Sequence, residues 1–160
     1  MEELIFFGEK QHALDAQCRL SIPGEWRRRE GETRLILIPT PGESLLLFPF
    51  ESFQDFLVKA RSISFSDPAA QKALARLGAR SRDCRCDKQG RIKLEREMLN
   101  RIGIQTQVCL IGAVTHIRLC APEIWEKLQY EDEESCFAEL QKIGENNPDL
   151  ARLFQGTIGR

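Results

Sequence analysis

The chain has 160 residues and a formal net charge of −1, with 42% apolar and 29% charged residues. This length fits one ordinary domain or two very small ones, and this composition is that of a globular protein, which excludes disordered, collagen-like and membrane-spanning chains. The N-terminal sequence MEELIFFG combines an acidic flank with a short apolar core. It is not typical of a signal peptide, and we therefore expect a cytoplasmic protein.

Charge is distributed unevenly along the chain. Residues 1–130 carry 20 basic against 17 acidic side chains, a net of +3, whereas residues 131–160 carry 3 against 7, a net of −4. The whole-chain charge does not indicate a nucleic-acid-binding protein. A basic patch on one face is compatible with this average.

A tandem repeat organises the sequence. The segment LDAQCRLSIPGEWRRREG, which begins at Leu14, aligns without a gap with CDKQGRIKLEREMLNRIG, which begins at Cys86, at a constant offset of 72 residues. The identical pairs are Asp15 and Asp87, Gln17 and Gln89, Arg19 and Arg91, Glu25 and Glu97, Arg29 and Arg101, and Gly31 and Gly103. Two copies of one supersecondary unit are therefore predicted.

The first copy reads mainly as strands. Leu20–Ile22 alternates apolar and polar residues, and the apolar runs 35–38 and 45–48 flank a turn, which predicts a hairpin. A short helix is predicted over 25–29 and a longer one over 51–61. Trp26 and Phe53 occupy apolar positions and are predicted to lie in the core.

The second copy predicts the same order of elements. Its strands are 92–94, 108–111 and 117–120, its short helix is 97–101, and a further helix opens at Pro122 with Trp125 on its apolar face. Between the copies, Asp67 and Pro68 predict the start of a helix that runs to Leu77. The acidic run 131–134 leads into an amphipathic helix with Phe137, Leu140 and Ile143. One copy offers few strands, so we expect one α+β domain in which each small sheet is completed by the other repeat.

Cysteine and histidine usage argues against a metal site and against an enzyme. The absence of a secretory signal predicts reduced thiols for all six cysteines: Cys18, Cys84, Cys86, Cys109, Cys120 and Cys136. His12 and His116 stand alone, without metal-ligand spacing or an acid–base constellation. No Gly-rich phosphate loop, nucleophile elbow or H-E-x-x-H motif occurs. We expect no catalytic residue, metal, cofactor or small-molecule substrate.

The repeated Asp-x-x-x-Arg frame carries the strongest functional signal. In DAQCR (15–19) and DKQGR (87–91), the Asp can accept backbone N–H bonds and hold a tight turn at the head of a strand. The Arg projects a planar, permanently charged fork. Bracing of the turn is the preferred interpretation for Asp15 and Asp87, together with Gly90. For Arg19 and Arg91, bracing and an external contact are equally compatible with the spacing.

Two such frames about seventy residues apart, together with the start GEKQHALDAQCRLSIP, resemble the MraZ family of bacterial transcriptional regulators over roughly residues 5–145. The resemblance implies two tandem AbrB-like, β-barrel-type repeats of the swapped-hairpin or double-split kind, with peripheral helices. The implied boundaries are 5–61 and 80–130 for the repeats, 62–79 for a helical connector and 131–160 for an acidic C-terminal helix and tail. It also implies sequence-specific binding to double-stranded DNA, a ring-like homo-oligomer, a place on the nucleoid, and control of the division and cell-wall gene cluster.

By position, Arg19 and Arg91 match the arginines that contact DNA in this family. The chain departs from the family pattern at Gln17, a position that is commonly basic, at Cys18, usually Gly, and at Glu95, usually Pro. If the first turn requires a positive φ, Cys18 costs about 1–2 kcal/mol, so either that turn is shaped differently or its motif is partly degraded. The remaining DNA-binding residues that we predict are Gln17, Gln89, Lys88, Lys93 and Arg85.

Lys88 and Lys93 flank the second motif, so the second copy is predicted to be the better DNA reader. Arg80 and Arg82 precede it and, like Arg85, are candidates for phosphate contacts. Arg27–Arg29 are interpreted instead as a solvated face. The alternative function is an oligomeric scaffold or interaction protein that keeps the fold without binding DNA, as the net charge, Gln17 and Cys18 allow.

Overall fold

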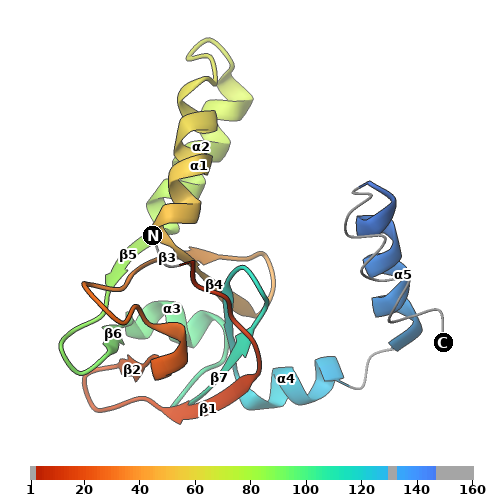
Figure 1. Ribbon diagram of the computed structural model, residues 1–160. Helices are drawn as coiled ribbons and strands as arrows, with labels where there is room; N and C mark the ends of the chain where they lie inside the picture. Colours follow the sequence, from red (N-terminus) through yellow and green to blue (C-terminus); the bar gives the residue numbers. More distant parts are fainter. Residues whose placement is uncertain (1–2, 130–132, 147–160) are drawn as a thin grey trace. The chain divides into compact units, whose positions relative to one another are not determined.

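The strands of the two repeats are interleaved within one antiparallel sheet. In the computed structural model, which describes residues 3–129 and 133–146, the strand order is β1-β7-β8-β4-β3-β5. The strands are β1 (Glu9–Ala13), β3 (Arg34–Pro39), β4 (Ser44–Pro49), β5 (Arg82–Arg85), β7 (Gln107–Gly112) and β8 (Ile117–Cys120). β1 pairs with β7 and β5 pairs with β3, so the first strand of each repeat extends the hairpin of the other (Figure 1). The expectation that each repeat completes the other is confirmed.

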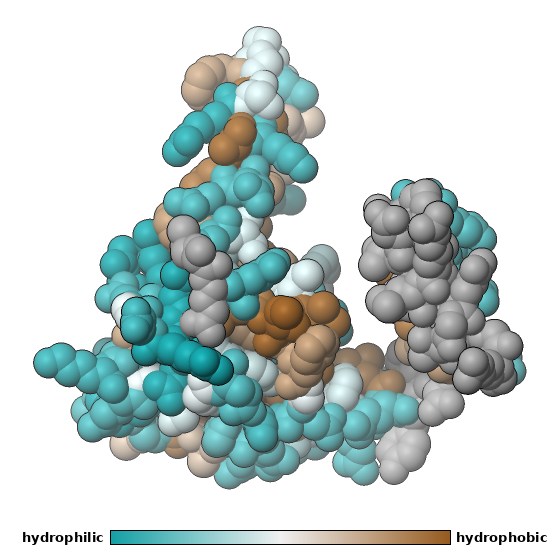
Figure 2. Space-filling model, in the orientation of Figure 1, coloured by the Kyte–Doolittle hydropathy of each residue, from teal (hydrophilic) through white to brown (hydrophobic). Residues whose placement is uncertain are grey.

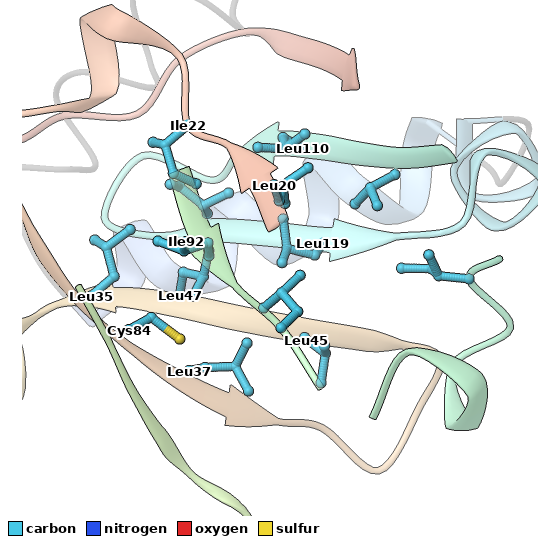
Figure 3. Close-up of a cluster of buried hydrophobic side chains, with 14 of the residues drawn as sticks. Leu20, Ile22, Leu35, Leu37, Leu45, Leu47, Cys84, Ile92, Leu110 and Leu119 are labelled. Atoms are coloured by element: carbon cyan, nitrogen blue, oxygen red, sulfur yellow. The ribbon is translucent and has the colours of Figure 1, made fainter. Parts of the chain in front are cut away.

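A separate two-stranded ribbon joins the repeats a second time. β2 (Arg19–Ser21) and β6 (Arg91–Lys93) run antiparallel, with Leu20 opposite Ile92. Both of these side chains are fully buried, and Figure 3 shows them among the sheet residues Leu47, Leu110 and Leu119. Side chains alternate between the two faces of a strand, so the residues that flank Leu20 and Ile92 face outward.

The core lies between the ribbon and one face of the sheet. Alternate residues of β3, β4, β7 and β8 point into it, as the apolar runs predict. The residues of these strands that belong to the core cluster are Leu35, Leu37, Leu45, Leu47, Val108, Leu110, Ile117 and Leu119. Trp26 joins them at 1% exposure, packs edge-on against Phe6 with ring centroids 6.0 Å apart, and donates its indole N–H to the carbonyl of Phe7 at 3.2 Å. Its predicted place in the core is confirmed.

The α+β class is confirmed, whereas a closed barrel is not. Within the described residues, β1 and β5 stand at the two ends of the strand order. The short helix expected at 97–101 is present as α3 (Arg96–Arg101), but the one expected at 25–29 is wrong. A 3-10 turn, η1 (Gly24–Trp26), takes its place because Arg27 adopts an extended conformation.

Two consecutive helices follow the first hairpin. α1 (Phe50–Arg61) and α2 (Pro68–Arg80) both contact β3 and extend away from the sheet (Figure 1). Asp67 caps α2 by accepting from the Ala70 N–H at 3.1 Å, as predicted, although the helix continues past Gly78. Phe53 is half-buried beside Phe56 and lies outside the core cluster, which corrects its predicted place. Figure 2 shows brown apolar side chains among hydrophilic ones on these helices.

The chain divides into two compact units, residues 1–124 and 125–160. α4 (Pro122–Gln129) crosses this division, and α5 (Glu133–Glu145) belongs to the second unit. The amphipathic helix predicted after the acidic run is thus present, with Phe137 and Ile143 nearly half exposed. Trp125 is half-buried. Among the described helices, none is long and apolar enough to cross a membrane.

All six cysteines are free thiols, and we expect a thiol titration to separate them. Burial raises the pKa of Cys84 to about 12 and those of Cys86 and Cys120 to about 11, whereas Cys136 is exposed. Since the thiolate is the reactive species, native protein at pH 8 should show a fast phase that Cys136→Ser removes. Denatured protein prepared without air should titrate six thiols. A lower count with a matching mass loss would show disulfides instead.

Candidate nucleic-acid interface

The two repeated motifs fold into the same Asp-held turn at the head of the ribbon strands. Asp15 Oδ1 accepts the backbone N–H groups of Gln17 and Arg19, each at 2.9 Å. Asp87 Oδ1 accepts those of Gln89 and Arg91 at 2.9 and 3.0 Å. The role of the two aspartates as turn braces follows directly from these bonds.

The same aspartates orient the two arginines. Asp15 Oδ2 accepts from Arg19 Nε at 2.6 Å, and Asp87 Oδ2 accepts from Arg91 Nε at 3.1 Å. Arg91 Nη1 also lies 3.7 Å from Asp15 Oδ2, so the four charged groups of both motifs meet. Only Nε of each guanidinium is hydrogen-bonded within the described chain, which leaves the outer edge formed by the two Nη atoms for another acceptor.

Backbone donors hold the aspartates in their charged form. The N–H of Arg19 is the main cause that lowers the pKa of Asp15, and the N–H of Arg91 is the main cause that lowers that of Asp87. Because a lowered folded-state pKa stabilises the fold above the unfolded value, this contribution is present at neutral pH and is lost as the pH falls through the folded pKa. Both aspartates are therefore charged at neutral pH and accept from the backbone of their turns.

Both turns require a residue with positive φ at the same place. Cys18 has φ of 59° and Gly90 has φ of 78°. The first turn is thus shaped like the second, and Cys18 bears the cost of a left-handed conformation, about 1–2 kcal/mol relative to glycine. Of the two explanations for Cys18, a differently shaped turn is therefore wrong.

Each turn is also contacted by an arginine from the opposite repeat, which the sequence did not reveal. Arg27 donates from Nε to the Ile22 carbonyl at 2.9 Å, and its guanidinium covers Gly90 so closely that a Cβ there would lie 2.4 Å from Cζ. Arg96 donates to Cys18 Sγ at 3.2 Å and to the Gln105 carbonyl at 2.9 Å. The solvated face predicted for Arg27–Arg29 is therefore wrong for Arg27, and also for the half-buried Arg28, which pairs with Glu51. The contacts of Arg27 with Gly90 and of Arg96 with Cys18 join distant segments, so no local pattern signals them.

The outward face of the ribbon gathers four residues from the two repeats. Arg19 lies opposite Lys93, and Ser21 lies opposite Arg91. Their side chains share one face because directly opposed residues point the same way. The adjoining turns add the exposed side chains of Gln17, Lys88 and Gln89. The molecular surface where Figure 1 places β2 and β6 is predominantly hydrophilic in Figure 2.

The arginines that precede the second motif lie outside this face. Arg85, in β5, pairs with Glu32 at 2.9 Å and with Asp83 at 3.6 Å. Arg82 forms two hydrogen bonds to Glu95, at 2.6 and 3.3 Å. Glu95, which stands where the resemblance implies a proline, therefore fixes the position of Arg82. Arg80 ends α2. The structure thus brings together the predicted DNA-binding residues of the ribbon and of its two turns. Arg85 lies apart from them, in strand β5 of the sheet.

Gly90→Ala should destabilise the protein by about 1–3 kcal/mol, because a side chain is strained at this positive φ. The Arg27 guanidinium would also have to move away from the new Cβ. Gly78→Ala is the matched control: Gly78 lies inside α2 with no atom in the way, so alanine there should stabilise by about 0.5–1 kcal/mol. Chemical denaturation measures both. Equal stability of the two variants would contradict the constraint on Gly90.

The fold and the site together define a protein of two interleaved repeats that presents a basic β-ribbon with an Asp-held arginine from each repeat. Residues 5–76 and 79–144 match the family described as "MraZ protein, putative antitoxin-like". The chain belongs to the MraZ family, as the resemblance indicates.

Several relatives carry the name "Transcriptional regulator MraZ". The protein from Symbiobacterium thermophilum is 31% identical over 86% of this chain and 99% of its own length. Those from Acetivibrio thermocellus and Lachnoclostridium phytofermentans are 30% and 26% identical over 79% and 88% of this chain, and 85% and 98% of their own lengths. The relatives thus support a transcription regulator.

Proposed function

We propose that this protein is a sequence-specific DNA-binding transcription regulator whose β2–β6 ribbon contacts double-stranded DNA. The observation that supports the proposal is the concentration of outward basic side chains on a ribbon whose opposite face is fully buried. A two-stranded antiparallel ribbon fits the major groove of B-form DNA, where base edges can be distinguished. A rigidly backed ribbon also presents its side chains with little loss of conformational freedom on binding.

Within this proposal, Arg19 and Arg91 read bases. An arginine held through Nε keeps two Nη atoms for the O6 and N7 acceptors of a guanine. Asp15 and Asp87 set the direction of these forks. Lys88 and Lys93 contact phosphates, and the exposed side chains of Gln17 and Gln89 contact phosphates or bases. Arg85, in β5 outside the ribbon face, contacts a phosphate beyond the ribbon by exchanging its ion pairs with Glu32 and Asp83.

Within this proposal, the protein works as a homo-oligomer, and the family resemblance implies that this oligomer is a ring. One subunit offers two small turns with one arginine each, which make few contacts. Several subunits at fixed spacing engage repeated DNA elements at high effective concentration. The proposed targets are promoter repeats upstream of the division and cell-wall gene cluster, which places the protein on the nucleoid.

Fluorescence anisotropy with a labelled duplex from the region upstream of the chain's own gene tests the proposal. Full-length protein should bind this duplex at least about tenfold more tightly than a scrambled duplex of the same composition at moderate salt. Equal binding to both duplexes would contradict sequence-specific recognition. An intact oligomer without any DNA binding would favour the scaffold alternative.

A further inference from the structure

In the folded ribbon, the two lysines of the second motif lie at opposite ends. By sequence, Lys88 and Lys93 both belong to the second motif, and their equivalents in the first repeat are the uncharged Ala16 and Ser21. In the antiparallel ribbon, however, Lys93 lies opposite Arg19 of the first motif. Lys88 stays in the turn that precedes Arg91. Each end of the ribbon therefore carries one arginine and one lysine.

A groove beside the first turn also places Lys93 next to the first motif. This groove, of about 650 Å³, is lined by Lys93 together with Ala16, Gln17 and Cys18 of the first motif. The smaller groove beside the second turn, about 290 Å³, is lined by Lys88 and Gly90. Lys93 thus belongs spatially to the first motif although it follows the second in sequence.

The surroundings of Lys93 leave its charge available. The other basic residues of its groove are occupied: Arg82 binds Glu95, and Arg96 binds the Gln105 carbonyl. Lys93 is exposed, and no hydrogen bond or ion pair involves it within the described residues. Like charges placed directly opposite on a sheet destabilise it, so the position of Lys93 opposite Arg19 does not serve the fold. It is instead suited to an anion outside the protein.

The geometry points to a composite DNA-reading half-site in which Lys93 of the second repeat works with Arg19 of the first and supplies the charge that Ala16 and Gln17 lack. This inference rests on the proposed DNA binding and concerns which lysine serves which motif. It makes the two ends of the ribbon equivalent in charge. Under this inference, the two motifs contribute about equally to DNA affinity, instead of the second motif contributing more.

A relocation experiment tests the composite half-site. Lys93→Ser should weaken binding to the specific duplex by about threefold to tenfold. Adding Ala16→Lys restores a lysine to the first turn and should bring the affinity back to within about twofold. Adding Ser21→Lys instead moves the lysine opposite Arg91 at the same net charge and should leave the affinity low. Lys72→Ser in α2 removes the same charge away from the ribbon and should change little.

Stability separates this role from a structural one. Denaturant unfolding of Lys93→Ser should show no loss of stability while DNA affinity falls, because the substitution removes a like-charge neighbour of Arg19. If Ser21→Lys restores affinity as well as Ala16→Lys does, or if Lys93→Ser binds like Lys72→Ser, the composite half-site is wrong. If Arg19→Ala and Arg91→Ala also bind DNA normally, the ribbon is not the DNA-contacting surface; if the unchanged protein binds neither duplex, the proposed DNA binding itself fails.

Discussion

Arg91→Ala and Arg19→Ala should each weaken specific DNA binding by about tenfold to a hundredfold, because a bidentate arginine–guanine contact contributes about 1–3 kcal/mol of discrimination. Since the composite ribbon gives both ends one arginine and one lysine, the two losses should agree within about threefold. Binding to a scrambled duplex should change less, because phosphate contacts remain. Titrations of both duplexes at one salt concentration measure these effects.

The fold should survive these substitutions. Each aspartate keeps two backbone donors after its arginine is removed, and partly exposed ion pairs contribute about 0–1 kcal/mol. Arg101→Ala is a matched control, because Arg101 pairs with Glu97 four residues away at 2.9 Å, in α3 and outside the ribbon. It should bind DNA like the unchanged protein. Unchanged affinity for Arg91→Ala, with a normal circular dichroism spectrum, would remove Arg91 from the proposed interface.

Trp26→Ala should lower the free energy of unfolding by about 3–5 kcal/mol. Its side chain is 1% exposed, packs against Phe6 and donates a hydrogen bond to the carbonyl of Phe7, so truncation leaves a cavity and removes this hydrogen bond. Chemical denaturation followed by circular dichroism measures the loss.

Trp125→Ala is the comparison for this prediction. Trp125 occupies an equally apolar place in the sequence but is only half-buried. Its truncation should therefore cost less than that of Trp26. A larger cost for Trp125→Ala would contradict the placement of the core around Trp26.

Local patterns predicted most strands and helices because apolar periodicity records which face is buried. The runs at 35–38, 45–48, 108–111 and 117–120 became β3, β4, β7 and β8. The helix expected at 25–29 is absent because Arg27 is extended, with its guanidinium bonded to the Ile22 carbonyl and lying over Gly90 of the other repeat. Gly78 did not end α2, since a glycine inside a helix costs only about 1 kcal/mol.

The offset of 72 residues located the two motif turns, and the Asp-x-x-x-Arg spacing identified their braces because those bonds are local. The positions of Lys93, Arg27 and Arg96 depend on strand pairing between repeats, which the spacing does not contain. For the same reason, the sequence did not reveal that Lys93 lies opposite Arg19. The repeat offset makes Leu20 and Ile92 equivalent residues. If the strands that contain them are assumed to pair antiparallel with these two residues opposite each other, Lys93 falls opposite Arg19.

The salt dependence of DNA binding is the decisive measurement for a DNA-contacting ribbon. The full-length protein, titrated against its upstream duplex over a range of potassium chloride concentrations, should lose affinity linearly in log–log form, with a slope of about −0.9 per phosphate neutralised. Lys88→Ala should make this slope shallower by about one unit for each subunit engaged, while Lys72→Ala should leave it unchanged. A protein that shows no salt-sensitive DNA binding even at low ionic strength would contradict a DNA-contacting ribbon.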